Sequence, residues 1–217
     1  MADSKVSDLT AIAEVLATTE FPTNDAGTSK KAIGSQISDY VKTQIVGKET
    51  EWFYFPHFVP ATTNGAAVGT LETATNKQNY KVYDFDATTD ESVHFQWALP
   101  KRWNESTITF QVWWSSTAVG TTGLAWALEA VALSDNEAID TAFGTPVVVT
   151  DDAQSAAGEV YITAESSAVT IAGTPAVGDI VFFRLFRDVS DANDDMSEDG
   201  RLIGVKIFWT SDAVNDV

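Results

Sequence analysis

A series of short segments rich in Val, Ile, Thr and aromatic residues begins near residue 52 and most constrains the fold. Clusters of Gly, Pro, Asn and Asp separate these segments, as is typical of β-strands joined by turns. We predict strands at residues 52–59, 80–86, 93–99, 107–114, 124–133, 146–150, 159–164, 169–171, 180–187 and 202–210. No helix-length pattern lies between them, which excludes the helical crossovers of a parallel sheet. The predicted fold class is therefore all-β, a two-sheet antiparallel jelly-roll sandwich, with an immunoglobulin-like sandwich as the alternative.

Alternation along these strands indicates which side chains enter the core, because successive side chains point to opposite faces of a sheet. In the last strand, the residues expected on one face are Ile203, Val205, Ile207 and Trp209. The run over residues 124–133 contains good helix formers, but the alternation of Trp126 with small Ala residues favours a strand.

Adjacent aromatic residues occur three times, at residues 113–114, 182–183 and 208–209. One member of each pair must lie on an outer face, and we assign Trp113, Phe182 and Phe208 to it. Grouped exposed aromatic residues mark interfaces, and burying one ring is worth about 1.5–3 kcal/mol. These three residues are therefore predicted to form the interface of a homo-oligomer. The alternative is that loops or the N-terminal segment cover them within one chain.

Residues 1–50 have a different pattern and are predicted to form a partly helical N-terminal arm, separate from a sandwich over residues 51–217. Apolar residues at helical spacing indicate one helix near residues 9–16 and a second from Ser35 until Gly47. Phe21-Pro22 and a turn at residues 24–27 interrupt the pattern. Helices this short do not hold alone in water, so the arm must dock on another surface. The predicted attachment residues are Leu9, Ile12, Leu16, Phe21, Ile33, Ile37, Tyr40 and Val41.

The charge balance excludes several classes of function. The 217 residues include 13 Lys and Arg against 31 Asp and Glu, a net charge of −18, and no Cys. This charge balance disfavours nucleic acid as a partner, because phosphate binding needs clustered cations. The absence of Cys excludes disulfides, a thiol nucleophile and thiolate zinc sites. No long apolar stretch follows Lys5 at the N-terminus, so we expect no secretory signal. No run of 18 apolar residues is present, so we expect no membrane-spanning helix.

Candidate chemistry is sparse, and we predict no catalytic residue and no cofactor. The two histidines, His57 and His94, accompany no catalytic motif. Asp84 and Asp86 lie two apart on a predicted strand and offer the carboxylate pair of a glycosidase. Acidic residues are so abundant here that such a pair arises by chance, and a structural role is favoured.

The loop over residues 188–200 holds many carboxylates. Asp191, Asn193 and Asp195 imitate the opening of an EF-hand loop, which makes them weak candidates for Ca²⁺. Met196 stands where that loop needs Gly, and Leu202 where it needs the bidentate Glu. A solvated connection between strands is therefore favoured over a metal site.

Two parts of the sequence resemble proteins of tailed-bacteriophage virions. Residues 5–10, 21–33 and 35–37 resemble the short leader that attaches many such proteins to the particle. The body resembles a family of phage structural proteins over residues 94–103, 106–114, 144–150, 182–188 and 201–208. The resemblance implies a virion jelly roll, commonly trimeric, that carries no catalytic residues.

These observations together predict a non-enzymatic virion structural protein. A trimeric jelly roll, anchored by the arm to phage capsid or tail proteins, would decorate the particle exterior as a capsid head fibre. The alternative is a tail-fibre protein that recognises host-surface carbohydrate through exposed Trp residues and loops. An enzyme that cleaves surface polysaccharide through Asp84 and Asp86 is a third hypothesis. Neither nucleic acid nor membrane is an expected partner.

Overall fold

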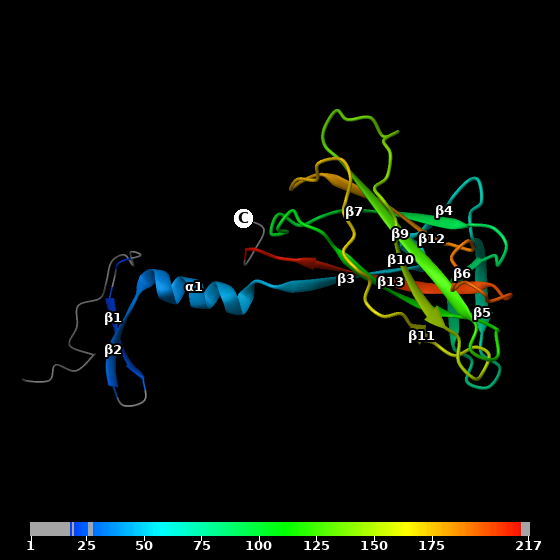
Figure 1. The fold of residues 1–217 in the computed structure, drawn as a ribbon, viewed down its shortest axis with the longest axis horizontal. Coiled ribbons are helices and arrows are strands. Elements are labelled where there is room, and N and C mark those ends of the chain that lie inside the picture. Colours follow the sequence, from blue (N-terminus) through cyan, green and yellow to red (C-terminus); the bar gives the residue numbers. More distant parts are fainter. Residues whose placement is uncertain (1–17, 19, 26–27, 214–217) are drawn as a thin grey trace, which may run out of the picture. The chain divides into compact units, whose positions relative to one another are not determined.

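The computed structural model describes residues 18, 20–25 and 28–213. The chain divides into two compact units, Met1–Gly47 and Lys48–Val217 (Figure 1). We call the first the N-terminal unit and the second the body. Within the described residues, no helix is both long and apolar enough to cross a membrane.

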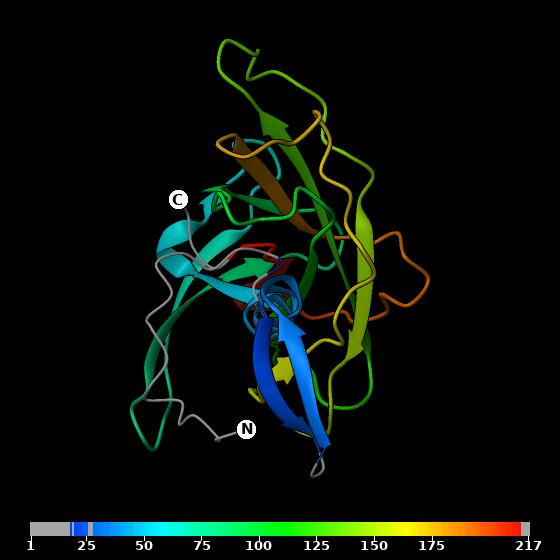
Figure 2. The same ribbon diagram turned by 90° about the vertical axis from the view of Figure 1, so that its left-hand side faces the viewer.

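Among its described residues, the N-terminal unit contains a β-hairpin followed by a helix (Figure 2). The hairpin pairs β1 (Glu20–Asp25) with β2 (Thr28–Ile33), and α1 (Gly34–Ile45) follows. The second predicted helix is confirmed by α1, while the first predicted helix lies outside the described residues. The backbone N–H of Ile33 donates to Oε1 of Gln36 at 3.0 Å and caps the start of α1.

The prediction that Phe21-Pro22 interrupts the helical pattern is confirmed, because both residues lie within strand β1 and not in a helix. A two-stranded hairpin has an open edge along each strand, where the missing N–H of a proline breaks no ladder. Pro22 pairs with Lys31, and the ends of the hairpin are held by an ion pair of 2.6 Å between Lys31 and Glu20.

The body is a sandwich of two sheets in which all paired strands are antiparallel, which confirms the predicted jelly-roll fold class. One sheet has the order β10 (Val147–Asp152), β9 (Gly123–Leu133), β12 (Ile180–Arg187), β7 (Ser92–Ala98), β4 (Val59–Pro60). The other has the order β11 (Tyr161–Ile162), β8 (Thr109–Ser115), β13 (Gly200–Thr210), β6 (Asn79–Phe85), β5 (Ala67–Glu72). In addition, β3 (Lys48–Tyr54) pairs with β13, and a 3-10 turn, η2 (Phe55–His57), follows β3.

Several strand predictions need correction. Residues 52–59 are not one strand, because η2 separates β3 from β4. Residues 169–171 form no named strand, although Val169 makes a bridge to Ile108. The edge strand β5 was not predicted, because its small and exposed residues lack the alternation of a half-buried strand.

The core lies between the two sheets and is built largely from aromatic rings. Trp114 and Trp126 are fully buried, and Phe95 stacks on Phe183 with a centroid separation of 4.7 Å. The run over β9 is buried along its entire length between β10 and β12. Packing on both faces and pairing on both edges therefore outweigh its helix propensity.

Candidate functional site

Strand β13 changes its pairing partner halfway along its length, and the candidate site lies at that change. Its first residues, Gly200–Leu202, pair with β6, and its later residues, Gly204–Thr210, pair with β3. The register shifts between Leu202 and Gly204, so that Ile203 sits in a bulge. Ile203 was predicted to face the core together with Val205, but the bulge turns it to line a groove instead.

The groove has a volume of about 560 Å³ and a mainly aromatic lining. Its aromatic side chains are Trp52, Tyr54, Phe55 and Tyr80, from β3, η2 and β6. Its polar side chains are Thr70, Asn79 and Lys81, from β5 and β6. Pro56 and Ile203 complete the lining, and none of these described residues is Asp or Glu.

Trp52 is held in place by a glycine and by a second tryptophan. A side chain at Gly204 would approach ring atoms of Trp52 to 2.5 Å, so the missing Cβ leaves the space that the indole occupies. The Trp52 ring also meets Trp113 edge to face, with centroids 4.9 Å apart and an interplanar angle of 87°. Trp52 is thus fixed before any ligand arrives, which lowers the entropy cost of binding.

Phe55, which lines one side of the groove, is held in position by contacts with Tyr83. The Tyr83 hydroxyl donates to the carbonyl oxygen of Phe58 at 2.7 Å and to that of Phe55 at 3.2 Å. Burial raises the pKa of Tyr83 and so keeps this donor protonated. Phe55 stacks on the Tyr83 ring at 5.2 Å, and the ammonium of Lys81 lies 4.5 Å from the Phe55 ring centroid.

Tyr54 is the most open ring of the groove, with 47% of its surface exposed. Its backbone N–H donates to Nδ1 of His57 at 3.2 Å, and the two rings meet edge to face. The role of His57 is therefore structural: its side chain joins η2 to the end of β3.

The residues predicted as an oligomer interface do not form one patch. Trp113 and Phe208 lie on the outer face of the sheet that carries the groove, where Lys206 lies over both rings. Phe182 belongs to the other sheet and lines a separate pocket with His94. The alternation of the three aromatic pairs is confirmed, since Trp114, Phe183 and Trp209 are buried. The oligomer itself stays a prediction.

The predicted attachment residues are split among the hairpin, α1 and the undescribed part of the chain. Ile37, Tyr40 and Val41 are exposed on α1, by 38%, 66% and 45%. Phe21 and Ile33 are half-buried in the hairpin. Leu9, Ile12 and Leu16 lie outside the described residues.

Asp84 and Asp86 are each engaged by a different partner. Asp84 pairs with Arg201 at 3.2 Å, and the pKa of Asp84 is raised, chiefly by burial, although Arg201 acts to lower it. Asp86 accepts hydrogen bonds from the backbone and hydroxyl of Thr88, which lower the pKa of Asp86. These contacts hold a strand pair and a turn, and they favour the structural interpretation of both carboxylates.

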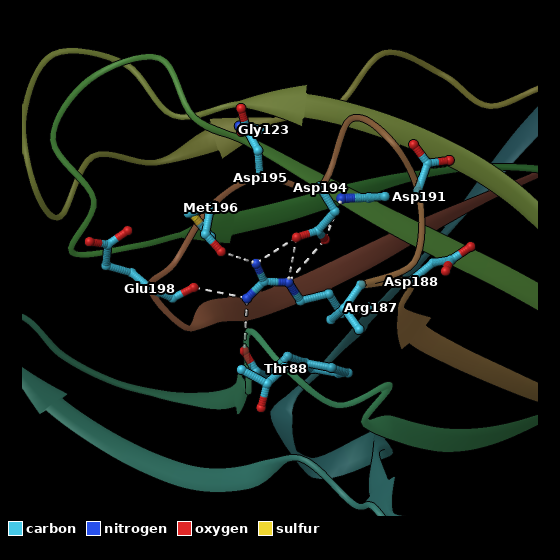
Figure 3. A network of polar contacts seen from close by, with 12 residues as sticks. Thr88, Gly123, Arg187, Asp188, Asp191, Asp194, Asp195, Met196 and Glu198 are labelled. Carbon is cyan, nitrogen blue, oxygen red and sulfur yellow. Dashed lines mark hydrogen bonds and ion pairs between the residues drawn. The ribbon is translucent and has the colours of Figure 1, made fainter.

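The acidic loop is organised around a buried guanidinium (Figure 3). Arg187 is fully buried and binds both carboxylate oxygens of Asp194, the shortest contact being 2.7 Å. It also donates to the carbonyl oxygens of Phe85, Met196 and Glu198. The cation at the centre of the acidic loop is therefore the guanidinium of Arg187, a residue for which no role was predicted.

The side chains of the three weak Ca²⁺ candidates have hydrogen-bond partners within the protein, and the amide of Asn193 donates to Asp191 at 2.9 Å. Asp195 accepts from the N–H of Gly123 at 2.6 Å, and Asp191 accepts from the N–H of Asn193 at 2.8 Å. No group of three or more metal-ligating side chains occurs among the described residues.

No protein-family model matches the sequence, and a search of curated proteins finds no match. Among solved structures, the chain is similar to the N-terminal CBM22-1–GH10 modules of xylanase 10B from Clostridium thermocellum, complexed with xylohexaose. The identity is 15% and the TM-score 0.41, with 75% of this chain covered but 28% of the xylanase chain.

A family 11 carbohydrate-binding module from Clostridium thermocellum has 14% identity and a TM-score of 0.40, with 75% and 95% coverage. A protein of unknown function from Shewanella oneidensis has 12% identity and a TM-score of 0.32, with 84% and 96% coverage. At such distances, a functional assignment has to come from the groove itself.

Proposed function

We propose that the protein is a non-enzymatic, carbohydrate-binding component of a virion. In this proposal the body binds a glycan in the aromatic groove, and the N-terminal unit attaches the chain to the particle. The single observation that supports glycan binding is the groove, in which fixed aromatic rings stand beside hydrogen-bonding side chains.

A saccharide matches this lining chemically. A pyranose ring has apolar C–H faces that pack against aromatic rings, while its hydroxyl groups need donors and acceptors at the rim. Trp52, Tyr54 and Tyr80 supply the rings, and Thr70 and Asn79 supply polar groups. The groove volume of about 560 Å³ lies within the range of about 300–1,000 Å³ that is usual for small-molecule sites.

The virion assignment rests on the resemblance of the leader and the body to phage structural proteins. The exposed apolar residues of α1, Ile37 and Val41, support a docking role for the N-terminal unit. A glycan-binding groove favours a receptor-binding tail protein over a capsid decoration protein, because adsorption to a host requires such recognition.

Glycan-array screening of the full chain, followed by calorimetric titration, tests the proposal. Tyr54→Ala and Tyr80→Ala should each weaken binding about tenfold, because each loses a ring contact of about 1.5 kcal/mol. Phe182→Ala removes a half-buried ring from the other sheet and is the matched control that should bind like the wild type. Circular dichroism melting verifies that each variant is folded.

Absence of glycan binding would contradict the proposal and leave capsid decoration as the hypothesis to test. Equal affinity of the wild type and both tyrosine variants would show that the groove is not the site.

A further inference from the structure

The body is strongly acidic, with 25 Asp and Glu against nine Lys and Arg in residues 48–217. Most of its cations are already neutralised by a carboxylate within 4 Å. The paired cations are Lys48, Lys77, Arg102, Arg184, Arg187 and Arg201. In the described part of the body, Lys81, Lys101 and Lys206 have no such ion pair.

Two of these three lysines lie on the sheet that carries the groove. Lys81 lines the groove, with its ammonium 4.5 Å from the Phe55 centroid. Lys206 pairs with Trp52 in the register of β13 and β3, and its ammonium lies 4.7 Å from the Trp113 centroid.

The acidic residue that is hydrogen-bonded to Asn79 of the groove is Glu72, and its carboxylate already has a cationic partner. Glu72 binds Lys77 at 3.0 Å and the side chain of Asn79 at 3.2 Å, and these contacts lower the pKa of Glu72. Its charge is thus balanced by Lys77. The groove is therefore an aromatic site with an uncompensated ammonium in an otherwise acidic body.

A neutral sugar has no charge to pair with this ammonium, whereas an acidic sugar has a carboxylate that can form an ion pair with it. A carboxylate on a saccharide would form a charge-assisted hydrogen bond with Lys81, stronger than a bond between neutral groups. The rest of the acidic surface repels such a ligand, so binding would be confined to the groove.

We infer that the groove takes an acidic saccharide, in which the carboxylate of a uronic-acid-type sugar pairs with Lys81 while the sugar ring packs on the aromatic lining. This inference rests on the proposed glycan-binding function and specifies its ligand class.

Calorimetric titration of the full chain with oligogalacturonate and with its methyl ester tests the inference, because the ester has the same backbone without the charge. The acid form should bind about tenfold more tightly than the ester. Lys81→Gln should remove that difference. Lys101→Gln, at an exposed lysine that also lacks an ion pair, is the matched control and should retain it.

The possible failures are distinguishable. Equal binding of acid and ester, with no selective effect of Lys81→Gln, overturns the inference and leaves glycan binding standing. If neither these probes nor the array glycans bind, both the inference and the proposed function are overturned.

Discussion

Replacing Arg187 with Met should strongly destabilise the body, because Asp194 would become a buried carboxylate without a counter-charge. The two side chains are 0% and 1% exposed, and their closest atoms are 2.7 Å apart. The guanidinium also donates to three carbonyl oxygens, which join the end of β6 to the acidic loop. Met fills part of the same volume, so the loss is mainly electrostatic.

The expected loss in the free energy of unfolding is about 3–5 kcal/mol, which is typical when one partner of a buried ion pair is removed. A domain is usually stable by about 5–15 kcal/mol, so this loss is a large fraction of the total. Adding Asp194→Asn should recover part of it. The amide oxygen of Asn still accepts from the N–H of Ala125, which Asp194 binds at 3.0 Å, and the stranded charge is gone.

Urea unfolding followed by tryptophan fluorescence measures the effect. All seven tryptophans lie in the body, so the signal reports on this unit. Arg201→Met is the matched control. Its ion pair with Asp84 has side chains 25% and 23% exposed, and its loss should cost about 1 kcal/mol. If Arg187→Met lowers stability no more than Arg201→Met does, the buried guanidinium is not what organises the loop.

Four further outcomes are expected. Asp151→Ala should cost about 1–3 kcal/mol in urea unfolding, because Nε1 of Trp114 loses its acceptor at 2.8 Å; Asp151→Asn keeps an acceptor and should cost less. Burial raises the pKa of Asp151 in the folded state, so the folded state binds a proton more readily than the unfolded state does. The wild type should therefore gain stability relative to Asp151→Asn as the pH falls through that pKa. A loss of relative stability over this pH range would contradict the prediction. Burial, followed by the charge of Arg184, lowers the pKa of His94 below 6.5, so the folded state resists protonation. Stability should therefore fall on acidification through that range, and His94→Gln should flatten the profile; parallel profiles would refute the assignment. Light scattering should give about three times the chain mass of 23.4 kDa, and a mass near 23.4 kDa would exclude the trimer.

Most strands of the body could be predicted because alternation is a local property. The side chains of Phe110, Val112 and Trp114 are buried while Trp113 between them is not, as a period of two requires. The same rule failed at Ile203, because a bulge inserts one residue and shifts the register. Strand β5 was not predicted, because an exposed edge strand needs no apolar face and so leaves no alternating pattern in the sequence.

The fold class, the division of aromatic residues between core and surface, and the acidic character of the body could all be predicted from the order of residues alone. These properties follow from the local period of the chain and from composition. Tertiary structure created the groove, because Trp52 and Tyr80 line the same space only where the pairing of β13 changes from β6 to β3. It also decided the partner of Arg187, whose contact with Phe85 spans 102 residues. Such contacts depend on which strands pair, and strand pairing is set by burial across the whole sandwich.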